Sequence, residues 1–202
     1  MNEIMEARLY GARMAARDLR LWGLDAYMLR YPVPLRRYEM ASGVEYRQEA
    51  LWMHRRTAGM LYDGMVFVSG ASSPEEARFT FTHEIAHRRL ETNHVSDRDD
   101  VAEAAADAYA GSLLVPETVL RRVLQARGIY TEMPFLFEDL VILRDELYSV
   151  ARGSDRREHF KVHVHTLVIA LADAGLVEGE VPFENHMPLL RRLSNVWWTK
   201  AI

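Results

Sequence analysis

Residues 73–87 constrain the fold more than any other part of the chain. Residues 73–76 read Ser-Pro-Glu-Glu, which supplies a cap residue, a proline at the first helical position and a glutamate that can complete a capping box. We therefore expect a helix over residues 74–90. Within it, residues 83–87 read His-Glu-Ile-Ala-His, and residues four apart lie on the same face of a helix. Two imidazoles placed in this way can converge on one metal ion.

His83 and His87 are accordingly candidate metal ligands, and Glu84 is the candidate catalytic base, because its place around the helix lets it face a water bound to that ion. Zinc suits the set, since imidazole and carboxylate can hold it without thiolate. The alternative interpretation is a pair of surface histidines with a solvated glutamate between them.

A catalytic zinc site needs a third protein ligand, and two templates compete for it. The metzincin pattern continues with a glycine and then a third histidine, but those positions hold Leu90 and Asn93, and His94 is one residue out of register. The other template takes a glutamate from a following helix, here expected over residues 101–114, and Glu103 lies near its start. An acidic residue in a first helical turn also favours the helix dipole, so spacing alone leaves both interpretations of Glu103 open.

Asp107 lies one turn after Glu103 on the same expected face. It is placed to accept a proton from a ligand histidine, which fixes the tautomer of the bound imidazole. Its alternative is an ordinary solvated aspartate, and we favour the role beside the metal.

Composition limits the function classes. The 202 residues include no cysteine, which excludes disulfides and thiolate ligands. The formal net charge of −4 makes direct binding of nucleic acid an unfavoured role, because such domains are usually basic. The longest apolar runs, such as residues 167–172, are too short to cross a bilayer. The acidic N-terminal residues lack the pattern of a secretory signal, so we expect a cytoplasmic protein with no membrane partner.

Most of the chain is expected to be helical. Apolar spacing predicts a helix over residues 3–30, ended by the prolines that follow. A β-rich run between Gly64 and Gly70 predicts a strand, and a second strand is expected near residues 51–57. Further helices are expected at four places: residues 74–90, 101–114, 117–127 and 135–151. A polar linker at 152–157 precedes a small helical unit at 158–176 that Gly175 closes.

Two motifs in this order resemble the ImmA/IrrE family of zinc metallopeptidases. The first is residues 78–87, Arg-Phe-Thr-Phe-Thr followed by the His-Glu-Ile-Ala-His motif. The second is residues 103–116, which resembles the family pattern E-x-x-A-[ND]-x-F-A-x-x-L-L-x-P with Tyr109 where phenylalanine is usual. A looser match at residues 162–176 resembles the family's helix-turn-helix-like element, and its departures favour a packing role over nucleic-acid binding.

The resemblance implies an α+β fold: a mainly helical zincin-like metallopeptidase domain with a small antiparallel sheet and a C-terminal helical subdomain. We expect the peptidase domain at residues 1–151 and the subdomain at residues 158–202. It further implies a zinc-dependent endopeptidase, with manganese able to serve in activity. The implied partner is a separate helix-turn-helix transcriptional repressor, whose inactivation derepresses genes.

The expected chemistry is metal-assisted peptide hydrolysis with Glu84 as general base. We expect an edge strand near Val66 to pair with an extended substrate segment. The oxyanion donor has candidates that the sequence does not rank, namely Tyr109, Tyr130, His163 and His165.

Two rival functions remain at this stage. A non-proteolytic repressor antagonist would keep the fold and inactivate its target by binding, although an intact Glu84 has no chemical purpose in a pure binder. A component of a toxin–antitoxin module is the second rival.

Overall fold

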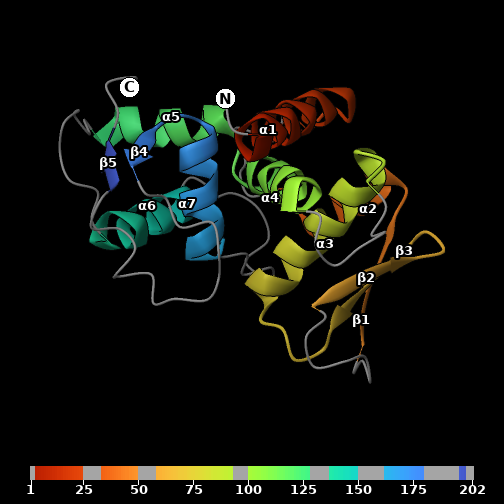
Figure 1. Cartoon of the computed structure of the whole chain (residues 1–202). Coiled ribbons are helices and arrows are strands. Elements are labelled where there is room, and N and C mark those ends of the chain that lie inside the picture. Colours follow the sequence, from red (N-terminus) through yellow and green to blue (C-terminus); the bar gives the residue numbers. More distant parts are fainter. Residues whose placement is uncertain are drawn as a thin grey trace.

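The structure, a computed structural model, describes residues 3–24, 33–49, 58–92, 100–127, 137–149, 162–179 and 196–198. Figure 1 shows a small sheet at one side of the molecule, helices beside it in the middle, and a further group of helices at the opposite side. The helices are α1 (Glu3–Leu21), α2 (Leu35–Ser42), α3 (Pro74–Arg89), α4 (Asp100–Leu114), α5 (Glu117–Arg127), α6 (Phe137–Ser149) and α7 (Val164–Asp173). The strands are β1 (Glu45–Glu49), β2 (Gly59–Tyr62), β3 (Met65–Ser69), β4 (Val177–Gly179) and β5 (Val196–Trp198).

This architecture confirms the expected mainly helical α+β class, with one difference in the sheet. β2 and β3 form an antiparallel hairpin, but β1 pairs with β3 in parallel, so the three-stranded sheet is mixed rather than antiparallel. The strand order is β1-β3-β2. Asp63 and Gly64 both have positive φ, as a two-residue hairpin turn requires, and this leaves the other edge of β3 for β1.

The strand expected between Gly64 and Gly70 is confirmed as β3, but its expected place at the edge of the sheet is wrong. β3 is the central strand, with a partner on each side. Val66 and Val68 are fully buried, as expected for a strand covered on one face. This burial does not tell a central strand from an edge strand, because that depends on partner strands elsewhere in the sequence. The second expected strand, near residues 51–57, lies outside the described residues.

α3 packs across the sheet and begins where the sequence predicts. Ser73 accepts a hydrogen bond from the Glu76 backbone N–H, and the Glu76 carboxylate accepts one from the Ser73 N–H, which completes a capping box. Phe81 and Ile85 are fully buried in the core, and burial of each such side chain stabilises the fold by about 1.5–3 kcal/mol. The second half of α3 is therefore held against the sheet.

α1 ends earlier than its apolar spacing suggested. Gly23 adopts a left-handed conformation with φ of 64°. The Leu24 N–H donates to the Leu19 carbonyl and the Gly23 N–H to the Arg20 carbonyl, which is a Schellman motif. The helix expected to residue 30 stops at Leu21 because this glycine turns the chain. Gly175 closes α7 in the same way, as predicted.

α1 lies directly on α4. A Cβ atom added to Gly11 would stand 2.0 Å from the Ala105 carbonyl oxygen, so the two helices approach as closely as backbones allow. Asp18 is buried at the same interface, where it accepts a hydrogen bond from the Tyr109 hydroxyl at 2.7 Å and a bidentate pair from Arg89. This network ties α1 to α4 and to the C-terminal end of α3.

α7 joins the same hydrophobic core. Leu167, Val168 and Leu171 belong to the cluster that includes core residues of α1, α3 and α4. Arg8 of α1 donates two hydrogen bonds to the Asp173 carboxylate, at 2.9 and 2.8 Å. The division into domains at residues 1–151 and 158–202 stays a prediction. Within the described part of the chain, no helix is both long and apolar enough to span a membrane.

Candidate metal centre

The second half of α3 places three of the predicted site residues. His83 and His87 project from one face, and their Nε2 atoms lie 2.9 Å apart. The His87 side chain is 3 % exposed and that of His83 is 15 % exposed. Glu84 is also buried. This pattern contradicts a solvated helix surface and requires the three polar side chains to have partners within the protein.

Glu103 comes to the histidine pair from the first turn of α4. Its two carboxylate oxygens lie 3.2 Å from His83 Nε2 and 3.4 Å from His87 Nε2. The side chain is half-exposed, so this side of the cluster faces solvent. The three candidate ligands offer donor atoms that all lie within 4.8 Å of one another. The structure thus brings together the two histidines and the glutamate that the sequence singled out.

The far nitrogen of each imidazole is also held. His83 Nδ1 lies 2.9 Å from Asp107 Oδ1, and His87 Nδ1 lies 3.0 Å from Thr92 Oγ1. A ligand histidine must present an Nε2 lone pair, which leaves its proton on Nδ1. Asp107 and Thr92 are each placed to accept that proton and so to fix the ring orientation.

Thr92 is a site residue that the sequence analysis missed. It reaches His87 because Glu91 adopts a positive φ of 55° and turns the chain back over the end of α3. The Thr92 N–H then donates to the His87 carbonyl at 3.1 Å. A glutamate in the left-handed region is rare, so the residue types around Glu91 do not predict this turn.

The electrostatics of the cluster favour a cation. Burial alone would lower the pKa of His83, but the hydrogen bonds that its ring donates to Asp107 and Glu103, together with the negative charges of these two carboxylates, outweigh it and raise the pKa to about 10. Two ring nitrogens and one carboxylate are also a donor set that zinc accepts. The residues present therefore fit a divalent metal ion.

Glu84 lies next to a close contact between α3 and the sheet. A Cβ atom added to Gly59 of β2 would stand 2.3 Å from Thr80 Cγ2 and 3.6 Å from Glu84 Cγ. Only glycine lets the strand backbone approach the helix in this way. The backbone of β2 consequently runs directly beside the candidate base.

The described candidates for the oxyanion donor do not lie at the metal cluster. The Tyr109 hydroxyl donates to Asp18 at 2.7 Å, so it points toward α1 and does not reach the cluster. His163 is exposed and interacts with Glu76, at the opposite end of α3 from His87. Hydrogen bonds with Ser73 are the main cause that lowers the Glu76 pKa, and His163 contributes the least to that lowering. The side chain of His165 and the whole of Tyr130 lie outside the described residues.

Comparison with known families decides the relationship. Residues 45–140 match the peptidase M78 family, described as an IrrE N-terminal-like domain. The chain contains an M78 domain. This agrees with the ImmA/IrrE resemblance of the two sequence motifs, and it supports a metallopeptidase-like function. No curated protein matches the chain.

The M78 match covers the sheet, α3 and α4, and with them every residue of the metal cluster. α1 and α7 lie outside the matched range. The relationship to the family therefore accounts for the chemistry-bearing half of the molecule and leaves the helices behind α4 to be explained separately.

Proposed function

We propose that this protein is a zinc-dependent endopeptidase in which His83, His87 and Glu103 hold the metal and Glu84 is the general base. The convergence of the two histidines and Glu103 carries the proposal. The sequence left Glu103 with an alternative explanation at a helix start, and its oxygens instead lie within 3.4 Å of both Nε2 atoms. Zinc is the metal that this donor set suits best, and manganese is the substitute to try in activity assays.

The chemistry that bound zinc supplies at such a site is polarisation of the scissile carbonyl and activation of the attacking water. The protein residues divide the remaining tasks. Glu84 accepts the proton of the attacking water and returns it to the leaving amine. Asp107 and Thr92 accept the Nδ1 protons of His83 and His87, which keeps both Nε2 lone pairs directed at the ion.

The edge of β2 is the place where the substrate backbone can be held. β2 is at the end of the strand order, and in the described part of the chain only β3 pairs with it. Gly59 brings this strand against Glu84. An extended peptide added to β2 would gain main-chain hydrogen bonds while its scissile bond lies beside the base. β2 therefore takes the role that the sequence analysis assigned to the region near Val66.

The proposed substrate is a protein, and we infer a helix-turn-helix repressor from the ImmA/IrrE resemblance and the M78 match. Cleavage would release the genes that the repressor silences. The proposed compartment is the cytoplasm, where such a repressor acts, and the proposal needs neither a membrane partner nor direct contact with DNA.

The test uses this chain and a candidate helix-turn-helix repressor from the same organism. Incubation with zinc or manganese should yield repressor fragments, detected by intact mass, and a chelator should stop the reaction. Glu84→Gln is the matched control, because it keeps the side-chain volume and removes the base. We expect it to retain zinc and repressor binding while turnover falls roughly 10²- to 10⁴-fold.

A non-proteolytic antagonist would behave differently in the same comparison. If Glu84→Gln derepresses the target genes in cells as well as the parent protein does, the peptidase proposal fails and binding alone is the function. The buried position of Glu84 speaks for the peptidase, because a binding protein gains nothing from a buried carboxylate next to its metal site.

A further inference from the structure

A cavity of about 650 Å³ opens on the other side of α4. Ser112 lines it, and nine residues at 100° each place Ser112 half a turn around α4 from Glu103. None of the metal-cluster residues contributes to its wall. The lining residues come from α1, the junction of α4 and α5, and α7: Leu9, Ala12, Arg13, Ala16, Leu19, Arg20, Ser112, Val115, Pro116, Glu117, Thr118, Ala170, Asp173 and Ala174. A volume of roughly 300–1,000 Å³ is typical of small-molecule sites.

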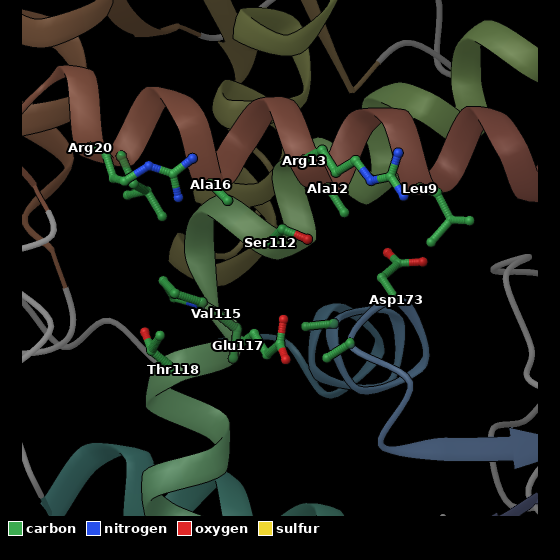
Figure 2. Close-up of a pocket in the computed structure, with 14 residues that line it drawn as sticks. Leu9, Ala12, Arg13, Ala16, Arg20, Ser112, Val115, Glu117, Thr118 and Asp173 are labelled. Carbon is green, nitrogen blue, oxygen red and sulfur yellow. The ribbon is translucent and has the colours of Figure 1, made fainter. Parts of the chain in front are cut away.

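Most of the side chains that line the cavity are small or apolar. α1 turns one face, which includes Gly11 and Ala15, into the core against α4, and it leaves a second face with Leu9, Ala12 and Ala16 toward the cavity. Figure 2 shows these α1 residues across the space from Ser112, Val115 and Asp173. Leu9 and Ala16 are exposed, although the opposite walls are near. The alanines on α1 and α7 leave room that longer side chains would fill.

The unbalanced charge around the cavity is positive. Arg13 and Arg20 stand on α1, seven residues and therefore about 10 Å apart along the helix axis. In the described part of the chain, no acidic group pairs with either guanidinium. The two carboxylates of the wall are already satisfied. Asp173 is paired with Arg8 at 2.8 Å, and Glu117 is paired with Arg121 at 2.7 Å.

We propose that this cavity binds a small organic anion with an apolar body, of the class of a medium-chain carboxylate. An arginine fork matches the two oxygens of a carboxylate, and Arg13 and Arg20 offer two such forks at the rim. The apolar body would lie against Leu9, Ala12 and Ala16 and displace water from them. The first turn of α5 also lines the cavity, and its dipole favours negative charge there.

The proposed site has a measurable consequence for stability. Its walls belong to four separate helices, α1, α4, α5 and α7, so it exists only when α1 and α7 are packed on α4 and α5. A ligand that binds only the folded state stabilises it in proportion to the logarithm of its concentration. Binding can therefore be measured without any peptidase activity, and its outcome is independent of the function proposed above.

The probe is decanoate, compared with 1-decanol and decylammonium, which share its chain but carry no charge or the opposite charge. Isothermal titration and thermal unfolding of the full chain should show decanoate binding at least about 10-fold tighter than 1-decanol. Decylammonium should not bind. Equal binding of decanoate and 1-decanol, or no binding of decanoate, would overturn the proposal.

Variants locate the site. Replacing both arginines, Arg13→Gln with Arg20→Gln, should weaken decanoate about 10-fold, whereas Arg17→Gln should leave its affinity unchanged. Arg17 is the matched control because it is exposed on the same helix and does not line the cavity. Ala16→Phe should block decanoate by filling the space, with little strain because Ala16 is exposed. Full decanoate affinity in Ala16→Phe, or an equal loss in Arg17→Gln, would contradict this location.

Discussion

The two sides of α4 are built for different tasks. The side toward α3 carries Glu103 and Asp107, which are half-exposed and partly exposed and which both reach His83. The side toward α1 is in backbone contact at Gly11, and its Tyr109 hydroxyl donates a hydrogen bond to Asp18. Neither carboxylate lies at the tightly packed interface.

This difference between the two sides indicates where α4 tolerates substitutions. Toward α1, a single methyl group has no room, so that side fixes the position of α4. Toward α3, the polar groups are spaced to share one cation, and their arrangement costs stability unless that cation or a proton is present. The tightly packed side thus holds the polar side in place, and substitutions on the two sides should affect different measurements.

The largest effect is expected from His87→Ala. The variant loses one of three proposed ligands, so metal content should fall from one zinc per chain to a trace, and proteolysis should stop. The helix should persist, because alanine is the best helix former. Metal analysis and circular dichroism check both points, and His163→Ala, an exposed histidine, is the control. Full zinc content in His87→Ala would remove it from the ligand set.

Asp107→Ala should have the next largest effect. Loss of the acceptor for His83 Nδ1 should weaken zinc binding by about 10- to 100-fold with the melting temperature little changed. Thr92→Val removes the neutral acceptor of His87 and should weaken zinc less, since hydrogen bonds to charged groups are the stronger ones. Competition with a zinc-binding dye measures both affinities. An unchanged zinc affinity in Asp107→Ala would show that Asp107 is an ordinary solvated aspartate with no role at the metal.

Gly11→Ala tests the rigid side. The added methyl group would press on the Ala105 carbonyl, and overpacking of this kind costs about 1–3 kcal/mol. The usual gain of an alanine over a glycine in a helix, about 1 kcal/mol, offsets part of this. We expect a lower denaturation midpoint. A higher midpoint would show that α1 and α4 lie farther apart than described.

Tyr109→Phe should have the smallest effect. It removes the hydrogen bond to Asp18 and leaves the Arg89 pair in place, so a loss of about 1.5 kcal/mol in unfolding free energy is expected, the low end for a bond to a charged group. Urea denaturation measures it. Zinc affinity and turnover should stay at parent values, and a fall in turnover with zinc retained would reinstate Tyr109 as an oxyanion donor.

The sequence predicted the parts of the site that depend on local chemistry. The start of α3 follows from a capping box contained in residues 73–76, and the shared face of His83 and His87 follows from helical geometry. The spacing of Glu103 also suits a helix start, so its prediction as a ligand depends on Asp107 one turn later and on the family motifs. In the structure it lies beside both histidines.

The parts that sequence reasoning missed depend on tertiary contacts. The approach of Gly59 to Glu84 is visible only as space for a missing Cβ. Thr92 depends on an unusual backbone angle at Glu91. The order of the strands depends on which edge of β3 receives β1, and the alternation of buried residues along β3 is the same for a central and an edge strand.

The ion pair between Arg8 and Asp173 joins residues 165 positions apart, and this has a consequence for synthesis. α1 leaves the ribosome long before its partner in α7. At about 5–20 residues per second, α1 waits roughly 10–30 s for Asp173. During that interval Ile4, Met5 and Leu9, which stay exposed even in the finished fold, belong to a helix that lacks its late contact. The first helix is therefore open to chaperones that bind short apolar stretches until α7 has been made.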